Sequence, residues 1–289
     1  MAEKDIKNEC LLKWQASEEE IEWFKTHFED WCEFATEEER EVCFKLLKNF
    51  DFYSKRHVNI NFSHLQEQLV EDYHIDPEYT IYTVLKDKYG RANSSLEYFL
   101  EYIYLNKIND KCKIEDLESV NEEAFKYIQN IVVIDDCIGT GSTLMKYLDK
   151  YKEMFQGKKI YVVLIHAIED FIEKVKEYAK ENKLMLEIVC ENVKKKAFHE
   201  ETDEIIEKFK QISRQRGIPS DFTLGKGKVE GLMSFYNNTP NNTLGIFWYT
   251  TEQNTPLFHR KDDDKPGWLK MMEQKRERNV QNYENHEGK

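Results

Sequence analysis

Apolar residues recur at three- and four-residue steps along the first quarter of the chain. One stripe predicts an amphipathic helix and consists of Ile21, Phe24, Phe28, Trp31 and Phe34. Thr36 followed by Glu39 is a capping-box signature for the start of another helix. A further amphipathic stretch ends before Pro77. We therefore expect residues 1–76 to form a helical region that packs on the rest of the protein.

The pattern changes after Pro77, where short apolar runs alternate with helical periods. The runs predict buried strands and lie at 79–85, 131–134, 160–165 and 184–189. The helical periods begin near Ser142 and cover about 169–181 and 200–215. This alternation predicts a parallel sheet flanked by helices, to which Leu232–Tyr236 could add a fifth strand. We assign 77–260 to this α/β domain and 261–289 to a charged tail.

Composition narrows the class of protein. The 289 residues carry 42 Lys and Arg against 55 Asp and Glu, a net charge of −13, so binding to the phosphates of a nucleic acid is not expected. The chain is 13% aromatic and 34% charged, too aromatic for disorder and too polar for a membrane span. The six cysteines are scattered and the first residues do not resemble a signal peptide, which predicts reduced thiols in a cytoplasmic protein.

One segment has the pattern of an anion-binding site. The predicted strand 131–134 ends in Asp135 and Asp136, and a helix is predicted to begin near Ser142. The loop between them is built from Gly139, Thr140, Gly141, Ser142 and Thr143. Small residues allow main-chain N–H groups to converge on an anion, and the helix start adds unpaired N–H groups and partial positive charge. The segment therefore predicts a site for one phosphate.

The adjacent aspartates extend this interpretation. Two carboxylates beside a phosphate can accept hydrogen bonds from vicinal sugar hydroxyls, and they can hold Mg²⁺ directly or through water. Phosphate, sugar and metal together suggest a phosphorylated ribose. The competing interpretation is an ordinary strand-to-helix turn. A Walker A loop is excluded because no Lys follows Gly141, and a dinucleotide fingerprint is excluded because its third Gly is missing.

The segment resembles the signature of the type I phosphoribosyltransferases, whose strand, acidic pair and small-residue loop match from Asp135 to Leu144 without a gap. The resemblance implies a type I phosphoribosyltransferase-like parallel sheet with an N-terminal helical region. It implies that Gly139–Thr143 would bind the 5′-phosphate of phosphoribosyl pyrophosphate. Asp135 and Asp136 would bind the ribose hydroxyls, form the catalytic pair and approach Mg²⁺. Ile138 would lie near the incoming base.

A second block resembles a particular branch of that superfamily. It reads Asn238-Thr239-Pro240-Asn241-Asn242-Thr243-Leu244 and is similar to the phosphoribosyltransferase-like domain of bacterial conflict systems, including retron-associated anti-phage effectors. By this resemblance Asn241 and Asn242 would cover the ligand. A surface turn explains the same residues, since Asn and Pro favour turns. Partners from a defence operon are implied.

Family members carry a pyrophosphate loop with a cation beside a Gly after an early strand. The nearest match here lies within 86–95 and offers Lys86, Lys88, Gly90, Arg91 and Ser94. The residue order differs from the family's, and a solvated turn before a helix is an equal interpretation. No base-pocket motif is present, so the acceptor is not predicted.

We therefore expect a phosphoribosyltransferase-like enzyme that binds phosphoribosyl pyrophosphate or a nucleotide with Mg²⁺. It would act in defence by phosphoribosyl transfer or by breakdown of its ligand. The alternatives are a sensor that binds a phosphoribosyl nucleotide without turnover, and a structural partner in a defence complex.

Overall fold

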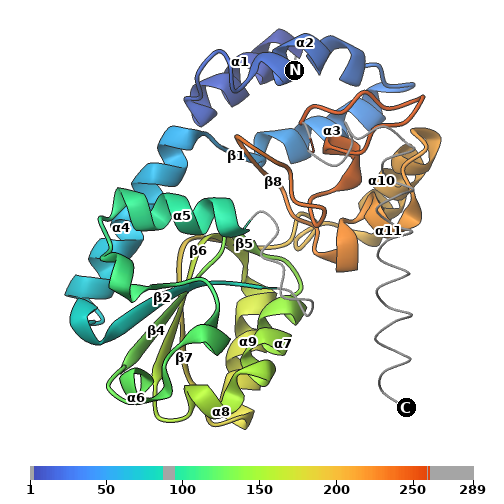
Figure 1. Ribbon diagram of the computed structural model, residues 1–289. Helices are drawn as coiled ribbons and strands as arrows, with labels where there is room; N and C mark the ends of the chain where they lie inside the picture. Colours follow the sequence, from blue (N-terminus) through green and yellow to red (C-terminus); the bar gives the residue numbers. More distant parts are fainter. Residues whose placement is uncertain (1–2, 87–94, 259, 261–289) are drawn as a thin grey trace, which may run out of the picture.

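The computed structural model describes residues 3–86, 95–258 and 260 (Figure 1). Its main sheet is parallel throughout, in the order β3-β2-β4-β6 with β7 beside β6. The strands are β2 (Thr80–Val84), β3 (Lys113–Ile114), β4 (Asn130–Ile134), β5 (Cys137–Ile138), β6 (Lys159–Ile168) and β7 (Met185–Lys194). Strands β4 and β5 pair in succession with the same edge of β6. The predicted parallel sheet is confirmed.

Helices cover both faces of this sheet. Figure 1 shows α4 (Lys55–Glu71) and α5 (Ser95–Leu105) on one face, and α7 (Ser142–Lys150) and α9 (Glu169–Glu181) on the other. Side chains along β4 alternate between the two apolar clusters beneath these helices, because successive residues of a strand point to opposite faces. The short helices α6 (Glu122–Phe125) and α8 (Lys152–Phe155) lie in the connections before β4 and β6.

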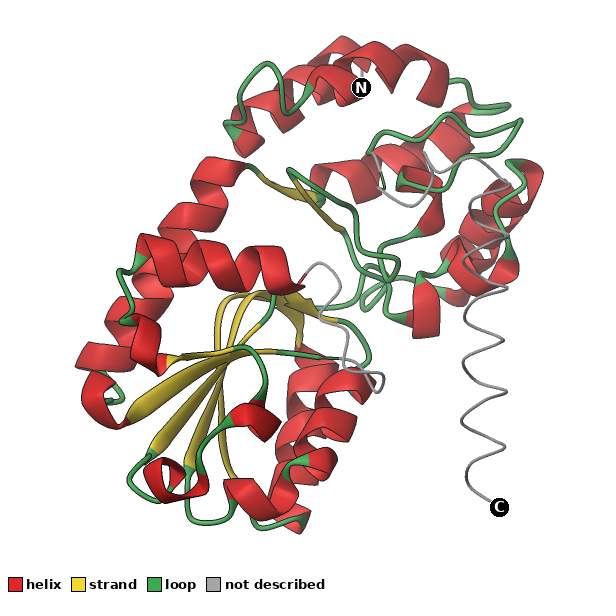
Figure 2. Ribbon diagram, viewed as in Figure 1, coloured by secondary structure: helices red, strands yellow, loops and turns green. Residues whose placement is uncertain are grey.

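The segment Leu232–Tyr236 contains a strand, but it does not join the main sheet. Strand β8 (Met233–Phe235) pairs in parallel with β1 (Asp51–Tyr53). Figure 2 shows this small pair apart from the main sheet. Strand β1 lies within the region expected to be helical. The main sheet instead gains β3 and β5, which have two residues each, too few to show an apolar pattern.

The remaining helices form an upper unit around a separate apolar cluster. Helices α1 (Glu3–Trp14), α2 (Glu22–Trp31) and α3 (Glu37–Lys48) pack there with α10 (Asp203–Gln215), and α11 (Ser220–Thr223) follows α10 in the chain. Helix α4 packs on the main sheet instead. The first 76 residues are thus divided between two cores, and the upper unit combines both ends of the described chain (Figure 1).

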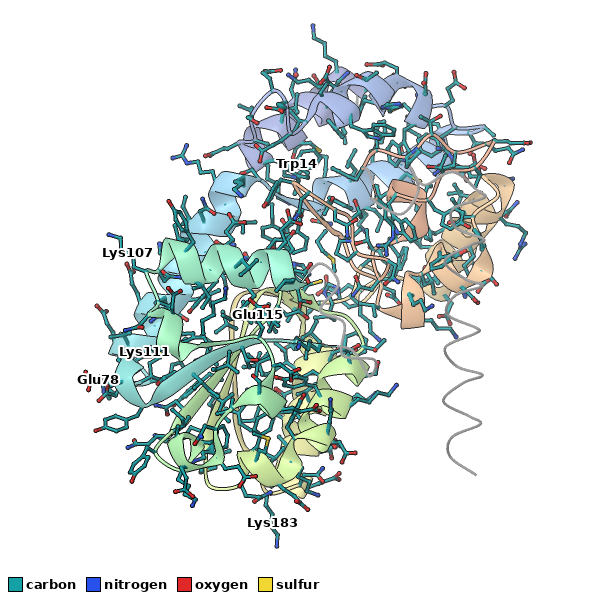
Figure 3. The ribbon with its side chains drawn as sticks, viewed as in Figure 1. Trp14, Glu78, Lys107, Lys111, Glu115 and Lys183 are labelled. Atoms are coloured by element: carbon teal, nitrogen blue, oxygen red, sulfur yellow. The ribbon has the colours of Figure 1, made fainter. Side chains whose placement is uncertain are left out.

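Two features hold the upper unit together. Arg216 is buried and donates hydrogen bonds to the carbonyl oxygens of Trp31, at 2.7 Å, and of Glu33, at 2.8 Å. It also donates to Oδ1 of Asn254, at 3.1 Å. The second feature is the apolar cluster itself, which is rich in aromatic rings. Trp14 is one of them, and Figure 3 labels it in this unit. The N-terminal helices and the C-terminal segment therefore share one core.

In the part of the chain that the structure describes, no helix is both long enough and apolar enough to cross a bilayer. The six cysteines are free thiols.

Candidate functional site

The order of the strands identifies one crevice for a ligand. The chain runs from β2 to β3 on one side of β2, and from β4 to β6 on the other side of β4. In open α/β sheets, ligands bind at such a reversal, outside the carboxyl ends of the two strands. Strands β2 and β4 end together, with Val84 paired to Ile134. The residues that follow them, Lys86 and the pair Asp135 and Asp136, therefore lie at the same edge.

Asp135 and Asp136 are fixed at the end of β4 by main-chain hydrogen bonds. The side chains are largely buried, with 7% and 8% of each residue exposed. The N–H of Asp136 donates to Oδ1 of Asp135, at 2.9 Å, and the N–H of Cys137 donates to Oδ1 of Asp136, at 2.7 Å. Each carboxyl group thus uses one oxygen to order the backbone beside it.

The electrostatics of the two carboxyl groups are unfavourable to their charged forms. Burial, and then the neighbouring charge of Asp136, raise the pKa of Asp135 well above its usual value. A hydrogen bond with Ser95, at the start of α5, opposes that shift. Burial also raises the pKa of Asp136. No ion pair within the described ranges involves either residue. The pair would therefore gain from a hydroxyl donor or a cation.

The loop between β5 and α7 has unpaired main-chain donors. Within residues 3–86, 95–258 and 260, no hydrogen bond is made by the N–H groups of Gly139, Thr140, Gly141 and Thr143. The N–H of Ser142 meets only Oγ1 of Thr140, at 3.4 Å. Gly141 is the residue before the helix and has a φ of +72°. A Cβ there would lie 2.7 Å from Cγ2 of Val175, so the position requires Gly. Such a loop can cradle an anion.

The C-terminal block covers this loop. A Cβ on Gly139 would lie 2.2 Å from Nδ2 of Asn242, so the Asn242 side chain rests directly on Gly139. Oδ1 of Asn242 is buried and has no hydrogen-bond partner within the described ranges. The carbonyl oxygen of Asn241 accepts a hydrogen bond from the N–H of Lys226, at 2.9 Å. The structure thus places Asn242 against the predicted loop, while Asn241 contacts Lys226.

The remaining predicted residues have different positions. Ile138 is 3% exposed and packs in the apolar cluster beneath α7 and α9, so a contact with a base stays a prediction. Nζ of Lys86 lies 3.7 Å from Oδ2 of Asp116. The other members of the proposed pyrophosphate loop, Lys88, Gly90, Arg91 and Ser94, lie outside the described residues.

Sequence reasoning missed one segment that contacts the loop. Gly227 has a φ of +71°, and a Cβ on it would lie 2.4 Å from Cγ2 of Thr140. Its neighbours are Lys226 and Lys228, both exposed. The available signal was the crowding of turn residues between Gly217 and Gly231, which marks a loop but not the partner that the loop contacts.

His166 lies beside the site but belongs to the core. It is 1% exposed, its Nδ1 is 2.9 Å from the hydroxyl of Tyr53, and burial lowers its pKa to about 4. The ring is therefore neutral at physiological pH and links β6 to β1.

The acidic pair could bind a metal ion only together with a bound ligand. The described residues include no group of three or more His, Cys, Asp or Glu side chains that could hold a metal ion by themselves. Asp135 and Asp136 nevertheless provide carboxylate oxygens, and Mg²⁺ commonly binds one or two carboxylates together with substrate phosphates. The residues fit Mg²⁺ in that shared arrangement.

The order of the strands, the acidic pair and the loop 139–143 are together typical of a phosphoribosyltransferase-like α/β protein. A family model described as PRTase-CE, where PRTase abbreviates phosphoribosyltransferase, matches residues 28–260. The chain belongs to the PRTase-CE family.

Comparison with solved structures finds similarity to several phosphoribosyltransferases. One is the xanthine-guanine-hypoxanthine phosphoribosyltransferase of Helicobacter pylori, with 13% identity over 41% of this chain and 77% of that one and a TM-score of 0.30. Another is the orotate phosphoribosyltransferase of Aeropyrum pernix, with 11% identity over 57% and 82% and a TM-score of 0.32. A third is the purine phosphoribosyltransferase of Pyrococcus horikoshii, with 13% identity over 50% and 85% and a TM-score of 0.28. No curated protein sequence matches the chain significantly.

Proposed function

We propose that this protein binds a 5-phosphoribosyl compound, either phosphoribosyl pyrophosphate or a nucleotide, at the carboxyl ends of β2 and β4. One observation carries the proposal: the unpaired N–H groups of Gly139, Thr140, Gly141 and Thr143 follow closely after two buried carboxyl groups at the reversal in strand order. The N–H groups would bind the 5′-phosphate. Asp135 and Asp136 would accept hydrogen bonds from the ribose 2′- and 3′-hydroxyls, which compensates the cost of burying them.

We propose phosphoribosyl transfer as the reaction. The bond from ribose C1 to the pyrophosphate oxygen breaks, its electron pair leaves with pyrophosphate, and a lone pair of the acceptor forms the new bond at C1. Positive charge grows on the ribose ring, and Asp135 and Asp136 stabilise it because they are fixed nearby before the reaction. Asp135 and Asp136 would hold Mg²⁺ together with the ligand, and the ion would supply positive charge that neutralises the leaving pyrophosphate.

Calorimetric titration with phosphoribosyl pyrophosphate and Mg²⁺, together with a pyrophosphate-release assay, tests this function. The double variant Asp135→Asn/Asp136→Asn should lose Mg²⁺-dependent binding by about tenfold or more, since hydrogen bonds to charged groups are strong. Asp72→Asn changes an exposed aspartate at the end of α4 and should leave binding intact. Absence of binding by the unmodified protein, or unchanged binding by the double variant, would reject the proposal.

A second candidate function is sensing without turnover. Both aspartates already use Oδ1 to order their own backbone, which favours a rigid binding site over a mobile catalytic base. Binding of phosphoribosyl pyrophosphate with no release of pyrophosphate in the presence of candidate bases and water would support this function.

We further propose that the protein acts in the cytoplasm as an effector of an anti-phage system, together with partner proteins. The support is the resemblance of Asn238–Leu244 to domains of such systems and, for the compartment, the six free thiols. Expression in bacteria challenged with phage tests the role. Protection or toxicity that persists in Asp135→Asn/Asp136→Asn would separate the defence role from ligand chemistry.

A further inference from the structure

The phosphate loop has a deficit of positive charge. From Asp135 to Leu144 the chain contains two carboxylates and neither Lys nor Arg. A phosphate monoester carries close to two negative charges at neutral pH. The protein as a whole has a net charge of −13, so its general field does not attract anions. A ligand phosphate bound here by main-chain N–H groups would therefore be stabilised further by cations from another part of the chain.

The segment 225–231 lies against this loop. Gly227 contacts Thr140 so closely that a Cβ would lie 2.4 Å from Cγ2 of Thr140. The segment has a fixed backbone: the N–H of Lys226 donates to Asn241 O at 2.9 Å, and the N–H of Gly231 donates to Asn242 O at 3.1 Å. Asn242 in turn rests on Gly139. Residues distant in the sequence thus frame the loop on two sides.

The backbone of this segment is held in conformations that need support. Gly225, Gly227, Lys228 and Glu230 have φ between +54° and +71°. Left-handed backbone is unfavourable for Lys and Glu and persists only where the surroundings impose it. The arrangement therefore fixes where Lys226 and Lys228 leave the main chain, on either side of the glycine that contacts Thr140.

Both lysines are available to a ligand. They are exposed, and neither forms an ion pair with a carboxylate of the described residues. Nζ of Lys226 lies 6.0 Å from the centre of the Phe222 ring, a long and weak contact. A lysine ammonium is a mobile point charge well suited to phosphate oxygens.

We propose that Lys226 and Lys228 form a cationic clamp that closes on the 5′-phosphate of the ligand bound in the 139–143 loop. The clamp neutralises the monoester, while the main-chain N–H groups orient it. This inference rests on the proposed phosphoribosyl site and adds residues that neither the loop motif nor the acidic pair includes.

Calorimetric titration with ribose 5-phosphate tests the clamp, because this probe carries the monoester and no pyrophosphate. Lys226→Gln and Lys228→Gln should each weaken binding by about tenfold, the effect of losing a charge-assisted hydrogen bond. The salt dependence of binding should become shallower in both variants. Lys183→Gln is the matched control: Lys183 is exposed, has a φ of +58°, close to the +54° of Lys228, and precedes β7 at the opposite end of the sheet (Figure 3).

The outcomes separate this inference from the function on which it rests. Weaker binding of ribose 5-phosphate in the two clamp variants, with Lys183→Gln unchanged, supports the clamp. Normal binding of ribose 5-phosphate in both clamp variants overturns it and leaves the phosphoribosyl site standing, even if binding of phosphoribosyl pyrophosphate falls. Failure of the unmodified protein to bind either compound overturns both. Circular dichroism and thermal unfolding verify that each variant is folded.

Discussion

Asp135 and Asp136 combine burial with mutual repulsion, and no cation of the described residues pairs with them. Groups that serve only stability are seldom arranged in this way, because a buried carboxylate without a counter-charge lowers the stability of the native state. Perturbed pKa values of this kind concentrate at functional sites. The pair therefore carries a cost in the free protein that a bound ligand can offset.

Replacing one of these carboxyl groups should stabilise the protein while damaging the site. We expect Asp135→Asn to raise the free energy of unfolding at pH 7.5 by about 1–2 kcal/mol, because the amide removes a buried charge that no counter-charge offsets. The native pKa of Asp135 is raised, so the native state binds more protons than the unfolded state. Stability of the unmodified protein therefore falls as pH rises above about 4, the usual pKa of Asp, through the raised value.

Urea unfolding at pH 4 and at pH 7.5 measures this difference. The gain of Asp135→Asn over the unmodified protein should shrink toward zero at pH 4, where the unfolded carboxyl group is itself becoming protonated. Asp72→Asn, at an exposed position, serves as the control and should show little gain at either pH. An Asp135→Asn protein that is less stable at pH 7.5 would mean that the carboxylate is stabilised by its surroundings.

At the scale of single residues, the local pattern pointed to contiguous features, and only the resemblance to a family pointed to the distant Asn241 and Asn242. The strand end, the acidic pair and the loop up to Thr143 adjoin one another in the chain, so spacing alone revealed them. The contacts of Asn242 with Gly139 and of Gly227 with Thr140 join residues about 90 to 100 positions apart. Such contacts depend on how the C-terminal segments pack against the main sheet, and no local sequence pattern predicts that packing.

Among the elements, the turn between β5 and α7 depends on close packing against the segment 225–231. Gly227→Ala tests this packing, because its Cβ would meet Thr140 at 2.4 Å while its φ is +71°. Gly157→Ala is the matched control, since Gly157 has a φ of +75° and a Cβ there meets nothing within 4 Å. Both variants should lose about 1–2 kcal/mol of stability from left-handed backbone.

Only Gly227→Ala should also weaken binding of ribose 5-phosphate, by about tenfold, because a displaced loop misplaces the groups that bind the ligand. Thermal unfolding and calorimetric titration of both variants provide the comparison. Equal affinity in the two variants would show that the contact between Gly227 and Thr140 has no role in the site.

The elements themselves were predicted unevenly, and their length explains why. Helix α9 occupies 169–181 as expected, since its thirteen residues display a full apolar period. Strands β1 and β3 have three and two residues, too few for any period. Strand β8 was recognised as apolar, but its partner β1 lies some 180 positions earlier, and pairing at such distance is set by tertiary packing.

On the scale of the whole molecule, the site lies between two units that have separate cores. The main sheet supplies the acidic pair and the loop 139–143. The segments 225–231 and 241–242, which cover the loop, follow α10 in the chain and adjoin the core that α10 shares with α1, α2 and α3. Ligand affinity should therefore depend on the integrity of the upper unit as well as on the sheet.

Arg216 makes this dependence testable, because it joins both ends of the chain within the upper unit. Arg216→Ala would leave the buried carbonyl oxygen of Trp31 and Oδ1 of Asn254 without their donor, and the partly buried carbonyl oxygen of Glu33 as well, at a cost of about 3 kcal/mol or more. Hydrogen exchange should then accelerate in α2 and α10, while β4 and β6 keep their protection because their core is separate. Binding of ribose 5-phosphate should fall in parallel, since the cover over the loop becomes less ordered.

Arg214→Ala is the control, because Arg214 is an exposed residue of α10 only two positions away. It should alter neither exchange nor affinity. If Arg216→Ala instead accelerates exchange equally in β4 and α2, the two cores unfold as one unit and the division proposed here is wrong. If α2 and α10 lose protection while the affinity for ribose 5-phosphate is unchanged, the main sheet and its loop bind the ligand alone. The segments 225–231 and 241–242 would then contact the loop without contributing to binding.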